Sequence, residues 1–501
     1  MQYALKRFFE RNEARLQRPL EIFPGLFSWG LITMPFWLSF WNPSIVAYFV
    51  ILFDVYWFYR SAQIALYSTQ SYLRLKAHEE VDWDGLTHTL KNLPMPLSKI
   101  HHVVIVPTYK EPLYILQRTL RRLTEQTFPK SQMTVVLATE KRDLNAPEVA
   151  QKLQKEFQQT FAHFFITVHP DILGEVKGKS SNMAWAGKWV TKKLQEEGYA
   201  LEHCTVTSCD ADSQLPSYYY SYLTYTFLTD EERYFHFYQG ALLFYNNIWR
   251  VPLPVRLINT MGSMWNLGIL MRPDKLFNMS TYSMSLKLCH EVGYWAVDVI
   301  PEDWHLFFKS FFSKGPKIKV IPLFLPIYQD AAESTSFFQT MVNQYEQMKR
   351  WAWGITDDPF IIKQWFLHPE IPFLSRTTVV LRALEGHFLW PVNWFILTLG
   401  ATLPPLLNPA FKETVLGRNL PLISGNILTL CLLFLLVLIV VDTKMKPKRP
   451  ESFPRKMVPL LYLQWIALPF VSFFLSALPG LDAHTRLMLG KYLEYRVTEK
   501  V

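Results

Sequence analysis

The chain has few cysteines and few charges for its length. Its 501 residues include four cysteines, and these show neither the C-x-x-C spacing of a zinc site nor the density of a disulfide framework. They are Cys204, Cys209, Cys289 and Cys431. No internal repeat and no low-complexity tract is present. Only 19% of the residues are charged, whereas 50% are hydrophobic and 16% aromatic. This balance is too apolar for an average soluble protein and indicates a membrane protein that carries a soluble part.

Two apolar runs near the amino terminus are each long enough for a spanning helix. Residues 22–41 and 44–66 meet the requirement of about 20 apolar residues, and the four-residue link WNPS between them allows only a hairpin. Basic residues flank the pair, whereas the link is uncharged: Lys6, Arg7, Arg11, Arg15, Arg18, Arg74 and Lys76. The positive-inside rule therefore predicts that the amino terminus and the segment after the second run face the cytoplasm. Because the basic residues cluster beside membrane segments, a nucleic-acid partner is poorly supported despite the net charge of +9.

Three further apolar runs follow in the second half of the chain, at 387–407, 425–441 and 458–480. Three crossings would leave the tail 481–501 outside the cell, although this tail is basic. We therefore expect one run to be re-entrant, and Pro469 makes 458–480 the candidate, because irregular backbone at membrane depth is tolerated only against protein.

The middle of the chain, residues 100–350, alternates between strand-like and helix-like sequence. The runs HHVVIVPTY and MTVVLATE are short and β-branched, and each is followed by a helical pattern. Such alternation predicts an α/β domain with a mostly parallel sheet. Ligands in this architecture bind at the carboxyl ends of the strands.

Two aspartates follow another strand-like run, CTVTSC, in the stretch SCDADSQLPS. Alternation along an extended segment is expected to turn the side chains of Asp210 and Asp212 the same way. Adjacent carboxylates at a strand end suit Mg²⁺ or Mn²⁺ bound together with substrate phosphates. A solvated turn before Pro216 is the alternative reading.

A second acidic pair occurs in VIPEDWHLFF, where Glu302 and Asp303 stand among apolar residues. A partly desolvated carboxylate can have the pKa that a general base needs. The alternative is an acidic pair that complements a helix dipole after Pro301.

A third motif lies in NQYEQMKRWAWG, where Gln347, Arg350 and Trp351 fall within little more than one helical turn. Arginine can bind phosphate oxygens, and an indole face can stack on a sugar ring. The alternative is an amphipathic helix at the bilayer surface with Trp351, Trp353 and Trp365 as interfacial anchors.

Taken in this order, the three motifs resemble the signature of the membrane-integrated family-2 glycosyltransferases of the cellulose synthase and hyaluronan synthase type. That signature is D-x-D, T-E-D and Q-x-x-R-W, and Q-x-x-R-W is its most specific part. The likeness extends to VIVPTYKEPL, to GEVKGKSSNMAWA, to the flanking apolar helices and to YRVTEK, which resembles the F-x-V-T-x-K gating loop of cellulose synthases. It implies a GT-A-like domain inserted between transmembrane helix blocks.

The resemblance also implies roles for individual residues. Asp210 and Asp212 would hold the Mg²⁺ or Mn²⁺ that bridges the diphosphate of a nucleotide sugar, and Arg350 would neutralise the leaving nucleoside diphosphate. Asp303 would deprotonate the acceptor hydroxyl for direct displacement with inversion, and Trp351 would stack the acceptor. Further substrate-binding residues would be Pro107, Thr108, Tyr109, Glu111, Glu140, Lys179, Glu302 and Gln347, and the gating residues would be Val497, Thr498 and Lys500.

Two positions depart from the family pattern. The aspartate motif that follows the second strand in the family is ATEKRD here, with Glu140 as the nearest substitute, which leaves UDP and GDP both open. Pro301 replaces the threonine before Glu302 and Asp303, a change expected to affect the local backbone more than proton transfer.

The sequence thus predicts four regions in order along the chain. They are a basic segment with two transmembrane helices (1–75), a cytoplasmic GT-A-like domain (95–355), interfacial helices with a carboxyl-terminal transmembrane region (356–480) and a cytoplasmic tail (481–501). The leading interpretation is polysaccharide synthesis from a nucleotide sugar at the cell membrane, with a glycan acceptor and membrane lipids as partners. A polyprenyl-phosphate or other lipid glycosyltransferase, and an inactive scaffold or transporter, are the alternatives.

Overall fold

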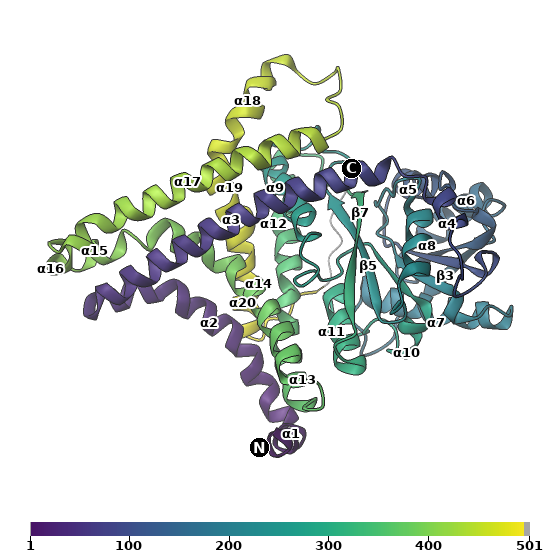
Figure 1. The fold of residues 1–501 in the computed structure, drawn as a ribbon, viewed down its shortest axis with the longest axis horizontal. Helices are drawn as coiled ribbons and strands as arrows, with labels where there is room; N and C mark the ends of the chain where they lie inside the picture. Colours follow the sequence, from purple (N-terminus) through teal and green to yellow (C-terminus); the bar gives the residue numbers. More distant parts are fainter. Residues whose placement is uncertain (1, 495–501) are drawn as a thin grey trace. The chain divides into compact units, whose positions relative to one another are not determined.

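The computed structural model of the chain describes residues 2–494, which form two compact units (Figure 1). The α/β unit comprises Leu73–Ile248 and Ile269–Ser334. The helical unit comprises the residues up to Tyr72, together with Trp249–Gly268 and Thr335–Leu493.

A seven-stranded sheet forms the centre of the α/β unit in the described part of the chain, with strand order β3-β2-β1-β4-β6-β5-β7. Its strands are β1 (His101–Pro107), β2 (Met133–Glu140), β3 (His163–His169), β4 (Cys204–Ser208), β5 (His236–Leu243), β6 (Tyr282–Ser285) and β7 (Lys319–Tyr328). Only β6 runs antiparallel to its neighbours β4 and β5, and the other pairs are parallel. The expected α/β class with a mostly parallel sheet is confirmed, and β1 and β2 lie where the β-branched runs predicted them.

The central strands are buried along their whole length because helices cover the sheet. Every residue of β1 and β2 is buried, as expected for parallel strands whose two faces are both packed. The helices of the unit are α4 (Trp83–His88), α5 (Leu113–Thr124), α6 (Ala146–Phe157), α7 (Lys179–Glu196), α8 (Tyr219–Thr229), α10 (Leu286–Glu291) and α11 (Glu302–Lys314). Val104 and Val106 of β1 share one core with Leu120 of α5, Leu153 of α6 and Leu223 of α8.

The aspartates expected on an extended segment lie in a turn instead. Strand β4 ends at Ser208, and the amide of Ser213 donates a hydrogen bond to the Asp210 carbonyl at 2.9 Å. A bond from residue i+3 to residue i closes a β-turn, so the period-2 alternation of a strand does not apply here. The prediction that Asp210 and Asp212 point the same way because of strand alternation is therefore wrong.

The helical unit contains the long apolar helices of the chain. Its helices are α1 (Gln2–Arg11), α2 (Glu13–Trp41), α3 (Pro43–Glu79, which continues into the α/β unit), α9 (Leu253–Ile269), α12 (Phe337–Ala352), α13 (Asp357–Leu367), α14 (Phe373–Leu399), α15 (Leu403–Leu407), α16 (Pro409–Lys412), α17 (Val415–Met445), α18 (Val458–Leu463), α19 (Leu468–Ser472) and α20 (Leu478–Met488). The expected hairpin between the first two apolar runs is present, because only Asn42 separates α2 from α3.

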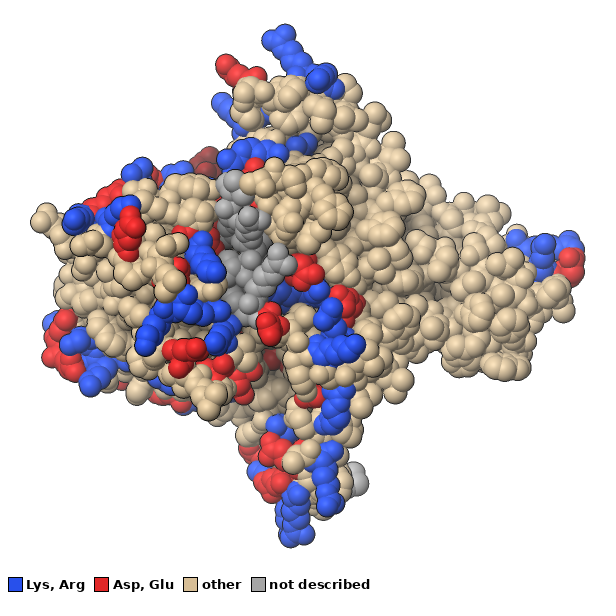
Figure 2. All heavy atoms as spheres, turned by 180° about the vertical axis from the view of Figure 1, so that it is seen from behind, with Lys and Arg blue, Asp and Glu red and all other residues tan. Residues whose placement is uncertain are grey.

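Four helical segments among the described residues are long and apolar enough to cross a membrane, by length and composition. They are Glu13–Trp41, Pro43–Glu79, Val415–Met445 and Arg455–Met488. In sequence order, the sheet domain therefore stands between two blocks of such helices, as expected. Figure 2 shows a broad area of the helical unit without Lys, Arg, Asp or Glu side chains, and charged residues at its tip.

The run expected to be re-entrant qualifies as a span, whereas another apolar run does not. Segment 455–488 is a continuous helical stretch, and its α-helical pieces α18, α19 and α20 each begin with a proline within the first two positions. Since proline removes a backbone donor, these prolines explain the 3₁₀ and π turns between the pieces. The run 387–407 is divided between α14 and α15 and is not among the four candidates. By length and composition 458–480 is thus a candidate span, and the expectation that it fails to cross stays a prediction.

Candidate active site

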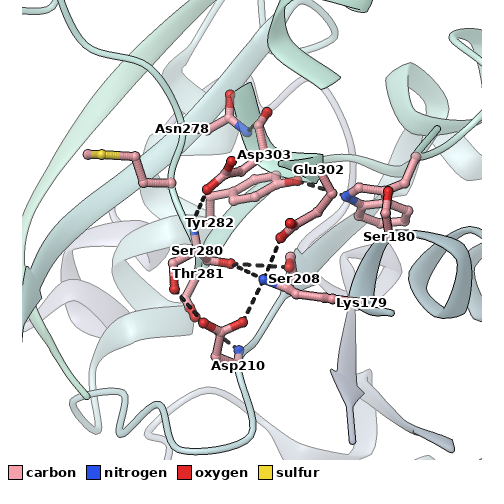
Figure 3. Close-up of polar contacts among 12 residues, drawn as sticks. Lys179, Ser180, Ser208, Asp210, Asn278, Ser280, Thr281, Tyr282, Glu302 and Asp303 are labelled. Carbon is pink, nitrogen blue, oxygen red and sulfur yellow. Dashed lines mark hydrogen bonds and ion pairs between the residues drawn. The ribbon is translucent and has the colours of Figure 1, made fainter. Parts of the chain in front are cut away.

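Two of the predicted carboxylates, Asp210 and Glu302, contact one largely buried lysine in the α/β unit (Figure 3). Lys179 is the first residue of α7, and its side chain is only 11% exposed. The ammonium nitrogen of Lys179 lies 2.5 Å from Oδ1 of Asp210 and 2.6 Å from Oε1 of Glu302, and it donates to the carbonyl of Ser280 at 2.9 Å. Burial acts to lower the pKa of Lys179, but the carboxylates of Asp210 and Glu302 raise it well above its ordinary value. The lysine is therefore a fixed positive charge that joins two of the three predicted motifs.

The carboxylate of Asp210 is held from several directions. Ser280 donates its hydroxyl to Oδ2 of Asp210 at 2.5 Å, and the Gln329 amide nitrogen lies 3.3 Å from the same oxygen. The amide of Asp210 donates to the Thr281 hydroxyl at 3.0 Å. With 28% of its side chain exposed, Asp210 is oriented by its neighbours and still accessible to a ligand.

Asp303 lies at the start of α11, on the other side of Ser280. Its Oδ2 accepts a hydrogen bond from the Ser280 amide at 2.9 Å, and its Oδ1 accepts one from the Trp304 amide at 2.8 Å. Burial, and then the charge of the neighbouring Glu302, raise the pKa of Asp303 to about 7. A carboxyl group with this pKa can accept a proton near neutral pH, as a general base must.

The second aspartate of the D-x-D motif faces a different neighbour. Oδ2 of the buried Asp212 accepts a hydrogen bond from the Asp330 amide at 2.9 Å. Asp330 follows β7, and its own carboxylate binds Arg118 of α5 through two contacts of 2.7 and 2.8 Å. Asp212 thereby ties the turn after β4 to the segment after β7.

The donor set of this site fits a divalent cation that is completed by substrate. No group of three or more His, Cys, Asp or Glu side chains that could hold a metal occurs in residues 2–494. Mg²⁺ does not need such a group, since it commonly uses one or two carboxylates together with phosphate oxygens and water. The cationic nitrogen of Lys179 already lies 2.5 Å from Asp210, which shows that the charge of this carboxylate attracts a cation. Asp210 is therefore a suitable metal ligand, and the participation of Asp212 stays a prediction.

The ends of the first two strands carry a second polar group. Pro107 ends β1, and the Thr108 amide donates to the Ala138 carbonyl of β2 at 2.9 Å. Glu140, the last residue of β2, is buried and lies 2.5 Å from Nε of Arg142. The guanidinium of Arg142 stacks on the Tyr109 ring at 3.8 Å.

This arrangement changes how Glu140 can act. The carboxylate of Glu140 is paired with the guanidinium of Arg142. A nucleotide base that contacted Glu140 would therefore also contact Arg142. Glu111 follows in the loop before α5. The predicted residues of VIVPTYKEPL therefore lie at the carboxyl ends of parallel strands, where ligands of this architecture bind.

The Q-x-x-R-W residues belong to α12 of the helical unit. Gln347 is buried, and its Oε1 accepts a hydrogen bond from Gln344, which in turn accepts one from Asn259 of α9. Trp351 is partly buried and packs against an apolar cluster of the same unit. A helix with a polar and an apolar face is compatible with both interpretations of this motif, namely phosphate and sugar binding and a position at the bilayer surface. The predicted gating residues Val497, Thr498 and Lys500 lie outside the described residues.

Sequence reasoning missed several residues that complete the site. Ser280, Gln329 and Asp330 contact the predicted aspartates, Arg118 contacts Asp330, and Arg142 contacts Glu140. Apart from Arg142, none of them stands in a motif that the sequence analysis used. Only Arg142 had a usable signal, because it lies two residues after Glu140 in the segment that departs from the family pattern.

Comparisons with known proteins found similar structures but no sequence match. Neither a protein family nor a curated protein matches the chain. Among solved structures, the chain is similar to mannosyltransferase PcManGT from Pyrobaculum calidifontis in complex with GDP-Man and Mn²⁺, at 14% identity and a TM-score of 0.41, over 77% of this chain and 99% of that chain. It is also similar to residues 1–349 of S. aureus TarS, at 13% identity and a TM-score of 0.36, over 79% of this chain and 93% of that chain.

A further structure of TarS 1–349, in complex with UDP-GlcNAc, is similar at 14% identity and a TM-score of 0.35. The solved structures that resemble the chain thus include a mannosyltransferase and a protein bound to a nucleotide sugar. At these TM-scores the likeness carries no argument about activity, so the function rests on the side chains of the site.

Proposed function

We propose that the chain is an inverting, metal-dependent glycosyltransferase of the cellulose synthase and hyaluronan synthase type. It would transfer a sugar from a UDP- or GDP-linked donor to a growing polysaccharide at the cytoplasmic face of the cell membrane. One observation carries the proposal. A single small site holds an oriented and accessible carboxylate, Asp210, and a second carboxylate, Asp303, whose pKa is raised to about 7.

Asp210 and Asp303 suit two different tasks in a displacement at a sugar, which are metal binding at the donor diphosphate and proton transfer from the acceptor hydroxyl. Asp210 and Asp212 would hold Mg²⁺ or Mn²⁺, which when bound would neutralise the donor diphosphate. Lys179 adds a fixed positive charge beside Asp210. Arg350 of α12 keeps the role that the resemblance implies, the neutralisation of the leaving group.

Asp303 would supply the base. Its carboxylate takes the proton from an acceptor hydroxyl while the oxygen of that hydroxyl forms a bond to the anomeric carbon. The bond from that carbon to the diphosphate oxygen breaks, and its electron pair leaves with the nucleoside diphosphate. One displacement inverts the anomeric centre. A double displacement, which retains the configuration, would instead need a nucleophile of the enzyme at that centre.

The membrane part supports the same proposal. If all four candidate helices cross, an even number of crossings returns the carboxyl-terminal tail to the side of the amino terminus. The basic residues that flank the apolar runs 22–41 and 44–66 favour the cytoplasm for that side. With this topology the YRVTEK tail would lie on the same side of the membrane as the α/β unit. Three carboxyl-terminal crossings would instead leave the basic tail outside the cell.

The test is a panel of donors with the purified full chain in detergent or lipid. Radiolabelled UDP- and GDP-sugars are incubated with Mg²⁺ or Mn²⁺, with an oligosaccharide acceptor in one arm and a polyprenyl phosphate in another. Transfer to the glycan supports the proposal, and transfer to the lipid alone supports the lipid-glycosyltransferase alternative. If the protein binds no nucleoside diphosphate and turns over no donor, an inactive scaffold or transporter replaces both.

A further inference from the structure

We propose that Ser280 is a positioning residue that fixes the metal-binding carboxylate Asp210 and the base Asp303 relative to each other. The proposal rests on the proposed function and adds to it a residue that no sequence motif indicates. Ser280 stands in the loop before β6, and Figure 3 shows it between Asp210, Asp303 and Lys179.

Each polar group of Ser280 contacts a different member of the site. Its amide donates to Oδ2 of Asp303 at 2.9 Å, and its hydroxyl donates to Oδ2 of Asp210 at 2.5 Å. Its carbonyl accepts from the ammonium of Lys179 at 2.9 Å. One residue thereby orients the proposed base, the proposed metal ligand and the fixed cation.

A neighbouring side chain determines the direction of the Ser280 hydroxyl. The amide nitrogen of Gln329 donates to Oγ of Ser280 at 2.7 Å and to the hydroxyl of Ser213 at 3.0 Å. An amide NH₂ can only donate, so Ser280 must use a lone pair toward Gln329 and is left to point its proton at Asp210. The hydroxyl is thus directed at the carboxylate rather than free to rotate.

The backbone of Ser280 indicates that its hydroxyl matters. Its φ angle of +55° lies in the left-handed region, which is strained for a residue with a side chain, whereas glycine adopts it without strain. Glycine would keep both backbone contacts of this position. What glycine would lose is the hydroxyl that binds Asp210.

As a consequence, the positions of the proposed metal ligand Asp210 and of the proposed base Asp303 are coupled through Ser280. With Oδ2 of Asp210 bound to Ser280, Oδ1 is the oxygen that faces Lys179. The amide of the same residue selects the orientation of Asp303. Active-site groups must be held within roughly 0.5 Å of the productive geometry, and a hydroxyl and an amide from one residue provide such a constraint.

The test compares Ser280→Gly and Ser280→Ala with the unchanged protein. Binding of UDP and GDP is measured by calorimetry over a range of Mn²⁺ concentrations, and kcat and KM are measured with the active donor. Both variants should need about tenfold more Mn²⁺ for half-maximal nucleotide binding, because each loses one hydrogen bond to a charged group. Their kcat should fall by a similar factor.

The pair of substitutions separates the hydroxyl from the backbone. If only the positive φ mattered, Ser280→Gly would match the unchanged protein and Ser280→Ala would not. Ser310→Ala is the matched control, since it removes a buried hydroxyl of α11 that bonds only the Leu306 carbonyl within its own helix. This control should leave the Mn²⁺ requirement and kcat unchanged.

A second variant covers the case in which Ser280→Gly does not fold. Gln329→Leu removes the donor that directs the Ser280 hydroxyl, together with the longer contact of 3.3 Å that Gln329 itself makes to Asp210, and should raise the Mn²⁺ requirement in the same direction. Wild-type Mn²⁺ requirement and kcat in Ser280→Gly, or in Gln329→Leu if the glycine variant is unfolded, would overturn the positioning role while the proposed function stands. If the wild-type protein turns over no donor, the proposed function is refuted, and the positioning role of Ser280 is refuted with it.

Discussion

Replacing Asp303 by asparagine removes the proposed base and keeps the size of its side chain. Both oxygens of Asp303 accept backbone hydrogen bonds, from the amides of Ser280 and Trp304. Asparagine offers one acceptor oxygen, so its NH₂ group must face one of these two donors. An unsatisfied buried donor costs about 1–3 kcal/mol. Removing a charge beside Glu302 offsets part of that cost, so Asp303→Asn should fold with a modest loss of stability.

The expected effect on the reaction is much larger than the effect on stability. Loss of a positioned base typically lowers the rate by about 10² to 10⁴, or roughly 3–5 kcal/mol of activation free energy. Donor binding depends on Asp210, Asp212 and the ends of β1 and β2 instead. Asp303→Asn should therefore bind the nucleoside diphosphate almost as the unchanged protein does, while product formation falls by at least about a hundredfold.

Initial rates of sugar transfer and calorimetric titration with UDP or GDP measure the two quantities separately, and a thermal melt verifies folding. Near-normal turnover in Asp303→Asn would refute the assignment of the base. So would a loss of nucleotide binding as severe as that of Asp212→Asn. In either case Glu302 would be the next candidate, although its carboxylate is already paired with Lys179 at 2.6 Å.

Three further outcomes follow from the same site, and a fourth concerns the tail. The pKa of Asp303 is raised to about 7, and the base must be ionised to accept a proton. The value of kcat/KM should therefore rise about tenfold per pH unit below pH 7 and level off above it. A flat profile from pH 5.5 to 8 would contradict this. Lys179→Met leaves Asp210 and Glu302 without their cation and should lower the free energy of unfolding by about 3–5 kcal/mol, as read from denaturation curves; an unchanged midpoint would argue against the pairing. EDTA should abolish transfer and Mn²⁺ or Mg²⁺ should restore it, whereas full activity in chelator would exclude a required metal. A cysteine in place of Val501 should resist impermeant thiol reagents in intact cells, and labelling from outside would place the tail on the other side.

The sequence by itself determined the elements and the order of the motifs. Strands β1 and β2 follow from short runs rich in β-branched and apolar residues, a pattern typical of strands packed on both faces. The hairpin of α2 and α3 follows from two long apolar runs with a short link. The acidic pair after Pro301 proved to open a helix, and this placed Asp303 at a helix start. These features depend on neighbours along the chain, so local patterns suffice to find them.

Only the tertiary structure decided which groups meet. Asp210 and Asp212 are two residues apart, yet one contacts Lys179 and Ser280 and the other contacts the amide of Asp330. Ser280 is 70 residues from Asp210 and 23 from Asp303, and no spacing rule links positions so distant. The raised pKa of Asp303 likewise depends on burial and on which charges surround it. The physical reason is that hydrogen bonds and charges act over a few ångströms in space, and the fold alone determines which distant residues come that close.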